Sequence, residues 1–266
     1  DNFFLSLKKN EPKDIIVVDG GSSDGTVEIA KKYCSSVFIR KPSIIGQQLF
    51  ALKKVDTNYV LIVETDQELP NGFLSKLAQD MEKQKFFGVQ AKLVCKYDRN
   101  FFEKGQKIFF EILQNDNNQF VEVSTSPSLF ENQKYLSKIE EMYNLSLGHN
   151  YDMDIFKSDI LNKKNLKVLK SKHIAYQVEK LSFKIYIKKI ISYGNGDYIY
   201  YKKNTKNWSF HRNFISLTHV FRRYVIVFPL ISIFRSNFLI AIPFFWLTAM
   251  IRYFAFLKNF FINKKS

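Results

Sequence analysis

The stretch DIIVVDGGSSDGT, residues 14–26, decides how the rest of the chain is interpreted. Its apolar run is typical of a buried strand, and the Gly- and Ser-rich segment that follows is typical of a tight loop. Residues 26–33 then predict a helix, with Asp24 as its N-cap, Glu28 in its first turn and two lysines in its last turn. A strand, a tight loop and a helix in this order indicate an α/β domain.

The same alternation continues along the chain. Residues 37–39 and 59–63 predict strands, and residues 46–54 and 70–83 predict helices. Strands that alternate with helices predict a mostly parallel sheet flanked by helices, with ligands at the carboxyl ends of the strands. Asp19 follows the first strand, and Glu64 and Asp66 follow the third. We therefore expect both acidic clusters at the same edge of the sheet.

The carboxylates of Glu64 and Asp66 lie one residue apart just beyond a strand, where both could converge on one cation. Mn²⁺ or Mg²⁺ prefers such oxygen ligands and can bridge them to substrate phosphates. The cation would offset the charge that develops on a departing nucleoside diphosphate. An acidic pair after a strand is also common in solvated loops, and Asp19 before two glycines could simply form an Asx turn.

Other candidate residues carry weaker signals. The loop at residues 19–25 has neither the GxGxxG nor the GxxxxGK[ST] pattern, although Ser22, Ser23 and the backbone amides could still approach a nucleotide. Asp152 could cap a helix or act as a general base that deprotonates an acceptor hydroxyl. His173 stands alone in a strand-like run, where a histidine is usually structural.

Residues 15–30 closely resemble the signature of the family 2 glycosyltransferases, which have the GT-A fold, and the resemblance continues in order over roughly residues 1–200. Residues 64–70 resemble the DxD segment of that family. Residues 151–154 resemble the segment that carries its catalytic base, and His173 with residues 188–196 resembles its acceptor-side region. The resemblance implies a Rossmann-like GT-A domain that transfers a sugar with inversion at the anomeric carbon.

The resemblance also implies a role for each site residue. The nucleotide-sugar donor, with a UDP-sugar expected first, would contact Asp19, Gly21, Ser22, Asp24, Thr65 and Asp66. Asp66 and Glu64 would hold Mn²⁺ or Mg²⁺, and Asp152 would be the catalytic base. Tyr151 and His173 would lie on the acceptor side.

The chain departs from the family pattern in four places. The opening strand is absent, so we expect residues 1–10 to begin in the first helix. Glu64 replaces the first Asp of DxD, and Tyr151 replaces the acidic residue before the base. Residues 46–48 lack the Arg that often faces the donor phosphates. These departures keep open a non-catalytic sugar- or nucleotide-binding relative. A nucleotidyltransferase of similar architecture is a further alternative, although its Gly-rich, basic amino-terminal loop is not visible in this sequence.

The carboxy-terminal region is apolar and basic. Residues 224–234 and 238–251 are two apolar runs, each shorter than the roughly 20 residues that cross a membrane, and Pro229 and Pro243 would kink a helix. Basic residues on both sides fit a hairpin whose two ends stay cytoplasmic, or helices that lie in the membrane interface. A pair of aromatic-rich core helices is the alternative. We predict a GT-A domain at 1–205, which includes a turn at residues 193–196, and a membrane-associating helical tail at 206–266.

The net charge of +15 indicates an anionic partner. The sequence has no zinc-finger spacing, basic-zipper heptads or RNP-like motif, so we expect no nucleic-acid binding. A Lys-rich surface beside an apolar anchor instead predicts contact with anionic lipid. Together these features predict a membrane-associated glycosyltransferase with a cytoplasmic catalytic domain and a lipid-linked or cell-envelope glycan acceptor.

Overall fold

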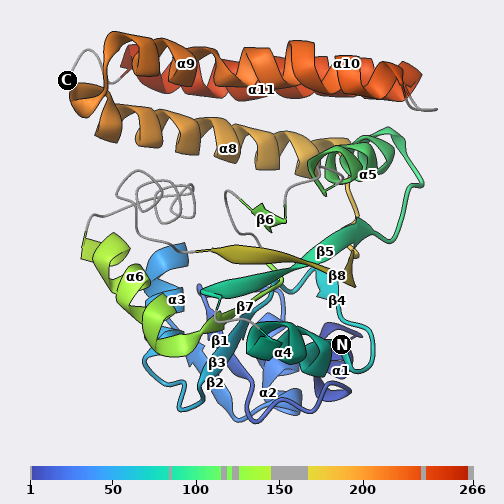
Figure 1. Ribbon diagram of the computed structural model, residues 1–266, viewed down its shortest axis with the longest axis vertical. Helices are drawn as coiled ribbons and strands as arrows, with labels where there is room; N and C mark the ends of the chain where they lie inside the picture. The colour runs from blue at the N-terminus through green and yellow to red at the C-terminus, as the bar shows by residue number, and fades with distance from the viewer. Residues whose placement is uncertain are drawn as a thin grey trace. The chain divides into compact units, whose positions relative to one another are not determined.

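The computed structural model describes residues 2–83, 86–114, 119–121, 126–144, 167–234 and 238–262 (Figure 1). These residues form two compact units. Unit 1 takes in the described residues of 1–94, 117–147 and 151–179, and unit 2 takes in those of 95–116 and 180–266. Unit 2 therefore begins earlier in the chain than the predicted tail at 206–266.

Unit 1 opens with a helix, a strand, a helix and a strand, as the sequence predicts. Helix α1 (Asn2–Lys8) precedes strand β1 (Ile16–Asp19), and helix α2 (Thr26–Tyr33) connects β1 to strand β2 (Ser36–Ile39). Strands β1 and β2 pair in parallel. The expected N-cap at Asp24 is wrong by one residue: Gly25 holds that position with φ +81°, a left-handed backbone conformation that favours glycine.

The larger sheet of unit 1 has the strand order β3-β7-β5-β8-β4, with β6 beside β8. Its strands are β3 (Tyr59–Ile62), β4 (Gln67–Glu68), β5 (Gly88–Cys95), β6 (Phe120–Val121), β7 (Ser128–Glu131) and β8 (Val168–Gln177). The α/β class with a helix-flanked sheet is confirmed. The strand directions are mixed rather than mostly parallel, because β3 pairs with the later strand β7, and the β3–β7, β5–β7, β4–β8 and β6–β8 pairs are antiparallel.

Three more helices pack on the sheets of unit 1. They are α3 (Ile44–Leu52), α4 (Phe73–Lys83) and α6 (Asn132–Asn144). Helices α3 and α6 enclose a buried cluster of Ile45, Leu52, Phe87, Phe130, Tyr135, Ile139 and Val168. The rings of Phe130 and Tyr135 stack with centroids 4.1 Å apart. The apolar faces of these helices therefore hold them against the sheet that carries the polar loops.

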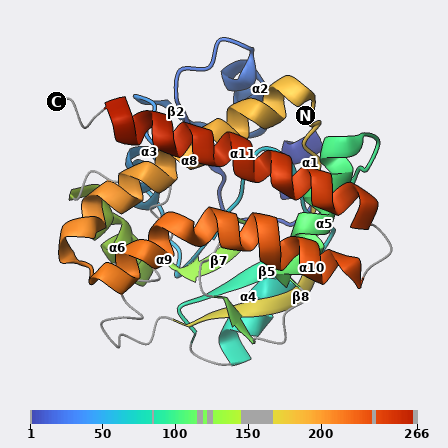
Figure 2. The ribbon, with the colours of Figure 1, turned by 90° about the horizontal axis from the view of Figure 1, so that it is seen from above.

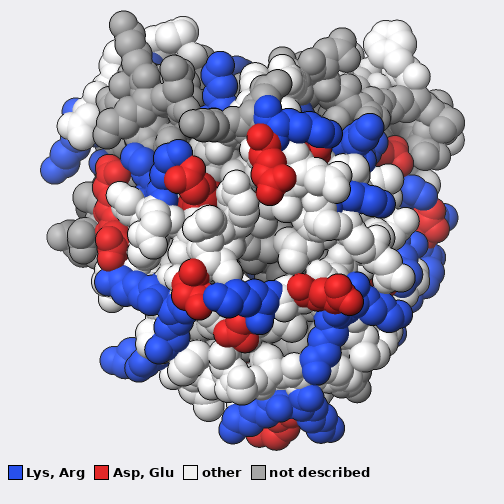
Figure 3. Space-filling model, turned by 60° about the horizontal axis from the view of Figure 1, so that its bottom comes forward, with Lys and Arg blue, Asp and Glu red and all other residues white. Residues whose placement is uncertain are grey.

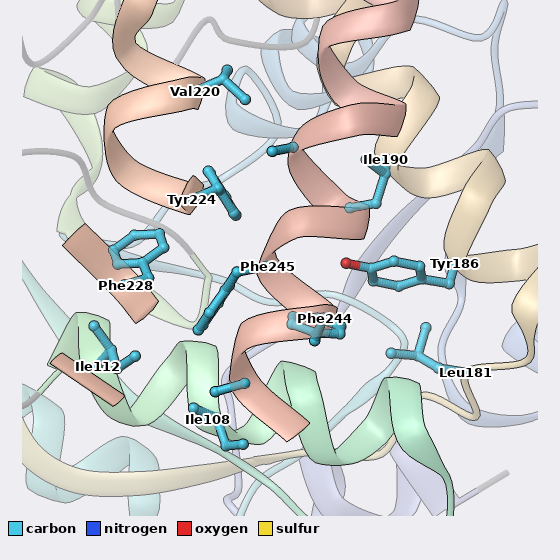
Figure 4. Packing of buried hydrophobic residues seen from close by; sticks show 12 residues of the cluster. Ile108, Ile112, Leu181, Tyr186, Ile190, Val220, Tyr224, Phe228, Phe244 and Phe245 are labelled. Atoms are coloured by element: carbon cyan, nitrogen blue, oxygen red, sulfur yellow. The ribbon is translucent and has the colours of Figure 1, made fainter. Parts of the chain in front are cut away.

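Unit 2 is helical. It consists of α5 (Phe101–Gln114), α8 (Phe183–Asn204), the 3₁₀ turn η1 (Thr205–Asn207), α9 (Phe210–Phe221), the π-helical segment η2 (Arg222–Val227), α10 (Phe228–Ile233) and α11 (Phe238–Ile262). Its core is rich in aromatic rings, with Tyr224, Phe228, Phe244 and Phe245 packed between the helices (Figure 4). Figure 2 shows α11 lying across α8, with the continuous α9–α10 segment beside α11.

The turn that the sequence predicts at residues 193–196 is wrong, because these residues lie inside α8. A Cβ atom on Gly194 would lie 2.2 Å from the carbonyl oxygen of Arg252 and 2.8 Å from Cβ of Ala255. Glycine at this position lets α8 and α11 approach closely. Close packing of two helices, rather than a change of chain direction, explains this glycine.

The carboxy-terminal helices are longer than the apolar runs suggest. The helical segments Phe210–Ile233 and Leu239–Ile262 each have 24 residues and are long and apolar enough to cross a membrane, by length and composition. The expectation that each run is too short is wrong, because the first helix starts at a Ser209 cap and both helices extend through polar residues. The π-helical segment lies just before Pro229, which has no N–H to donate to a regular helix.

Candidate active site

The carboxylate of Asp19 at the end of β1 is held by the loop that follows it. Its Oδ1 accepts hydrogen bonds from the backbone N–H groups of Gly21 at 2.7 Å and Ser22 at 2.6 Å, and its Oδ2 accepts one from the Ser22 hydroxyl at 2.8 Å. The Ser22 backbone N–H is the main cause that lowers the pKa of Asp19, and burial opposes it. Asp19 is 8% exposed and is therefore a fixed, ionised group at the strand end.

Glycines shape the same loop. Gly21 has φ +93° and Gly25 has φ +81°, and a Cβ atom at either position would meet no other atom within 4 Å. Asp24 accepts hydrogen bonds from the backbone N–H and the hydroxyl of Thr26, at 3.2 and 2.5 Å, and the hydroxyl is the main cause that lowers its pKa. The predicted residues Asp19, Gly21, Ser22 and Asp24 thus form one loop with two ionised carboxylates and open backbone.

The N-terminus of α3 lies beside this loop. The Gln47 side-chain amide donates to the backbone carbonyl of Val18 at 3.2 Å, and it would lie 3.4 Å from a Cβ atom on Gly20. Ser43 caps the helix by accepting the Gly46 N–H at 3.1 Å. Sequence reasoning noted residues 46–48 only for their missing arginine, and it did not identify Gln47 as a neighbour of the loop.

The turn after β3 presents Asp66. Its Oδ2 accepts a hydrogen bond from the Gln177 side-chain amide at 2.5 Å, and its backbone carbonyl accepts one from the Val178 N–H at 2.8 Å. The buried Gln67 accepts the Glu64 N–H at 3.1 Å and donates to the Ser126 carbonyl at 3.2 Å. These bonds fix the turn. Sequence reasoning missed both glutamines, because their role depends on pairing with distant segments.

The turn offers donors that suit a divalent cation. The Asp66 carboxylate is oriented by Gln177, and Glu64 and Thr65 are exposed beside it. Mg²⁺ is usually bound by one or two carboxylates together with substrate phosphates, so this donor set fits such an ion. Among the residues that the structure describes, no group of three or more His, Cys, Asp or Glu side chains forms a complete protein cage.

The acceptor-side residues are placed only in part. His173 on β8 lies against α4, with its Nε2 atom 3.5 Å from Oδ2 of Asp80. The Ser171 hydroxyl donates to the same oxygen at 2.8 Å, and it accepts the His173 backbone N–H at 3.1 Å. The other predicted residues of this group, Tyr151 and the candidate base Asp152, lie outside the described residues.

Several solved structures are similar to the chain. The mannosyltransferase PcManGT from Pyrobaculum calidifontis, solved with GDP-Man and Mn²⁺, superposes with a TM-score of 0.55 at 10% identity, over 95% of this chain and 81% of that one. TarS 1–349 from S. aureus, solved with UDP, matches at a TM-score of 0.46 and 15% identity, over 96% of this chain and 84% of that one. Its complex with UDP-GlcNAc gives 0.47 and 14%, over 98% and 87%. No curated protein sequence matches the chain.

The sequence itself identifies the family. The pattern described as Glycosyl transferase family 2 matches residues 1–164, which include the Asp19 loop, the Asp66 turn and the segment of Asp152. The likeness to PcManGT agrees with the GT-A fold that the sequence predicts. Because the match covers more than half of its residues, the chain belongs to glycosyl transferase family 2 and is a glycosyltransferase with the GT-A fold.

Proposed function

We propose that unit 1 binds a nucleotide sugar and moves its glycosyl group to an acceptor hydroxyl with inversion of the anomeric carbon. The observation that carries this proposal is the Asp19 carboxylate, which its own loop fixes with three hydrogen bonds at the end of β1. An ionised carboxylate has about four acceptor positions, so one is left for a ligand. A base N–H or a ribose hydroxyl of the nucleotide would donate to it.

We assign the donor diphosphate to the turn at residues 64–67. Asp66, held by Gln177, and Glu64 would bind Mn²⁺ or Mg²⁺, and the Thr65 hydroxyl would lie beside the phosphates. The bound cation supplies positive charge that stabilises the departing nucleoside diphosphate. The Gln177 amide keeps the Asp66 carboxylate in one orientation, so little reorganisation is needed when the donor binds.

We assign the general base to Asp152, on the resemblance to the family. Its carboxylate would accept the proton of the acceptor hydroxyl as that oxygen attacks the anomeric carbon. The bond between the anomeric carbon and the diphosphate oxygen breaks in the same step, and the electron pair leaves with the nucleoside diphosphate. Tyr151 and His173 would contact the acceptor. These roles balance the reaction without a covalent intermediate.

The family resemblance and the carboxy-terminal helices limit which donors and acceptors are worth testing first. The resemblance makes a UDP-sugar the first donor to test, and the GDP-Man bound by PcManGT makes GDP-mannose the second. The two apolar helices and the net charge of +15 support a membrane-associated enzyme whose catalytic domain is cytoplasmic. We therefore propose a lipid-linked or cell-envelope glycan as acceptor.

A donor screen tests the proposal. The full chain is incubated with a panel of nucleotide sugars and membrane extract, and nucleoside diphosphate release is measured with Mn²⁺, Mg²⁺ or a chelator. We expect metal-dependent release from one donor. Nucleotide binding without release from any donor would favour the non-catalytic alternative, and pyrophosphate release from a nucleoside triphosphate would favour a nucleotidyltransferase.

A pair of variants tests the assigned base. Asp152→Asn should lower transfer by about 10²–10⁴-fold and keep nucleotide affinity, because the amide cannot accept the proton. Asp154→Asn is the matched control, since it removes the same charge two residues away. Equal losses in the two variants would remove Asp152 as the base.

A further inference from the structure

Helix α11 exposes a stripe of large apolar side chains. Leu239, Trp246, Met250, Phe254 and Phe261 are each 52–75% exposed, and they follow one another at intervals of seven, four, four and seven residues. Such intervals place the side chains on one face of a helix. On α9, Phe210, Phe214 and Phe221 repeat the same spacing and are 52–88% exposed.

The opposite side of α11 is covered by α8 along most of its length. The Tyr186 hydroxyl is hydrogen-bonded to the Thr248 hydroxyl, and Gly194 packs on the backbone of Arg252. Further along, the Asn259 amide donates to the Asn195 side chain at 2.7 Å. The two helices therefore run in the same sense and stay in contact over much of their length, and Figure 2 shows α11 crossing over α8 at an angle.

This pairing conflicts with a crossing of the bilayer by α11. Helix α8 carries the exposed residues Lys184 and Lys188 beside the first half of α11, and Lys202 beside its end. Because this part of α8 contacts α11 at Thr248, a membrane-crossing α11 would carry the first two lysines into the hydrocarbon, where a lysine is strongly disfavoured. Only 39% of the most apolar stretch of Leu239–Ile262 is buried within the protein, so the exposed stripe of α11 still needs a partner.

Helix α5 gives a second, independent conflict. A Cβ atom on Gly105 would lie 2.1 Å from the Phe244 ring, so α5 packs directly on the first half of α11. The exposed residues Lys104 and Glu111 of α5 lie within one or two turns of this contact. If α11 crossed the bilayer, it would therefore bring charged side chains from two different helices, α5 and α8, into the membrane.

The basic charge of residues 198–266 indicates which kind of surface covers the apolar stripe of α11. Asp197 is the last acidic residue of the chain, and residues 198–266 contain eleven lysines and arginines. Arg222, Arg223 and Lys258 are exposed on the two apolar segments. On the face in Figure 3, by contrast, basic and acidic side chains are interspersed. An apolar stripe with basic residues and no acidic ones fits a membrane with anionic lipids.

We infer that α9–α10 and α11 lie in the plane of an anionic membrane surface rather than across the bilayer. The exposed stripes of both segments enter the interface, and α8 stays on the aqueous side of α11. This inference rests on the membrane association proposed above and gives it a geometry. It also explains the lysines of α8, which remain hydrated while the apolar stripe of α11 enters the membrane.

Depth-dependent fluorescence quenching distinguishes the two orientations. Single tryptophans are introduced as Phe214→Trp, Met250→Trp and Phe261→Trp in a Trp208→Phe/Trp246→Phe background, and the full chain is bound to vesicles of phosphatidylcholine and phosphatidylglycerol. Lipids with a nitroxide at a shallow or a deep acyl carbon act as quenchers. We expect all three positions to be quenched most by the shallow lipid and to the same extent. A deep Met250→Trp position between shallow ends would overturn the inference and show a crossing helix.

Partitioning into vesicles tests whether the exposed apolar face of α11 is the one that contacts the membrane. Met250→Asp and Phe254→Asp should each weaken binding to anionic vesicles about tenfold or more, because each replaces a large apolar side chain that would enter the membrane with a charged one. Ile199→Asp is the matched control on the exposed side of α8 and should bind as the parent does. A loss in Ile199→Asp equal to the others would overturn the assigned face. Absence of vesicle binding by the parent would overturn membrane association, and glycosyl transfer, measured separately as diphosphate release, would stand.

Discussion

Asp19 in unit 1 and Asp197 in unit 2 are both nearly buried aspartates, at 8% and 5% exposure, yet their partners differ. Asp19 is held by the backbone and the hydroxyl of residues two and three positions later. Asp197 on α8 is held by Arg252 on α11, with a bidentate pair of bonds at 2.5 and 2.8 Å. The same arginine donates to the Tyr224 hydroxyl at 3.2 Å.

The difference separates a ligand-directed carboxylate from a structural one. A carboxylate fixed by its own loop keeps acceptor capacity at a strand end, where α/β folds bind ligands. A carboxylate that faces an arginine from another helix uses its charge to join the two helices. We therefore expect substitutions around Asp19 and Asp66 to change catalysis and substitutions around Asp197 to change stability.

The largest expected effect is the loss of the buried ion pair. Asp197→Ala should lower the free energy of unfolding of unit 2 by about 3–5 kcal/mol, because Arg252 would keep a buried charge without its counter-ion. Both tryptophans of the chain, Trp208 and Trp246, belong to unit 2, so their fluorescence in urea reports its unfolding. The double variant Asp197→Leu/Arg252→Met should recover most of the loss. A change no larger than that of the exposed-pair variant Asp56→Ala would contradict the structural role.

The next effect belongs to the catalytic unit. Asp66→Ala should lower metal-dependent diphosphate release by about 10²–10³-fold, because the donor loses a charged contact that stabilises the leaving group. The tryptophan unfolding curve should not move. Asp56→Ala is the matched control, since it removes an exposed aspartate of unit 1 that pairs with Lys13. Donor affinity in Asp66→Ala that still rises with Mn²⁺ as much as it does in the parent would count against the assignment.

The sequence was sufficient wherever the contacts are local. The Asp19 loop is held by bonds that span two or three residues, so the run of residues 14–26 predicts both the strand and the loop. The family match over residues 1–164 includes this local motif. Helix α2 is confirmed for this reason as well, although Gly25 rather than Asp24 caps it.

The sequence was insufficient where the partner is distant. Gln177 reaches Asp66 over 111 residues, and Arg252 reaches Asp197 over 55 residues. The glycine pair at residues 194 and 196 has the composition of a turn, but the close approach of α11 makes it part of a helix. The predicted mostly parallel strand directions differ from the structure for the same reason, because the antiparallel pairing of β3 with β7 depends on the whole sheet.

A smaller effect should follow from closing the space between α8 and α11. Gly194→Ala adds a methyl group 2.2 Å from the Arg252 carbonyl oxygen. Overpacking costs about 1–3 kcal/mol, and the higher helix propensity of alanine offsets about 1 kcal/mol of it. We therefore expect a net loss of stability of about 0–2 kcal/mol in the tryptophan unfolding curve. Ile199→Ala, at an exposed position of the same helix, should stay within about 0.5 kcal/mol of the parent. A stabilised Gly194→Ala variant would show that the helices can separate without cost.

The smallest effect concerns the pH dependence of the Asp19 loop. The pKa of Asp19 lies below its ordinary value of 3.8, mainly because the Ser22 N–H stabilises the carboxylate. The folded state therefore binds the proton less readily than the unfolded state. The stabilisation is complete above pH 3.8 and is lost as the pH falls through the lower folded value.

Hydrogen exchange of residues 14–33, corrected for intrinsic rates, measures this loss at about pH 5 and about pH 2.5. Between these conditions the parent should lose local stability that Asp19→Asn does not lose, because asparagine does not titrate. Other carboxylates, such as Asp24, titrate in both proteins and cancel in the difference. Equal losses in the two proteins would mean that the loop does not hold Asp19 as an anion. The contrast between Asp19 and the ion-paired Asp197 would then rest only on the positions of their hydrogen-bond partners.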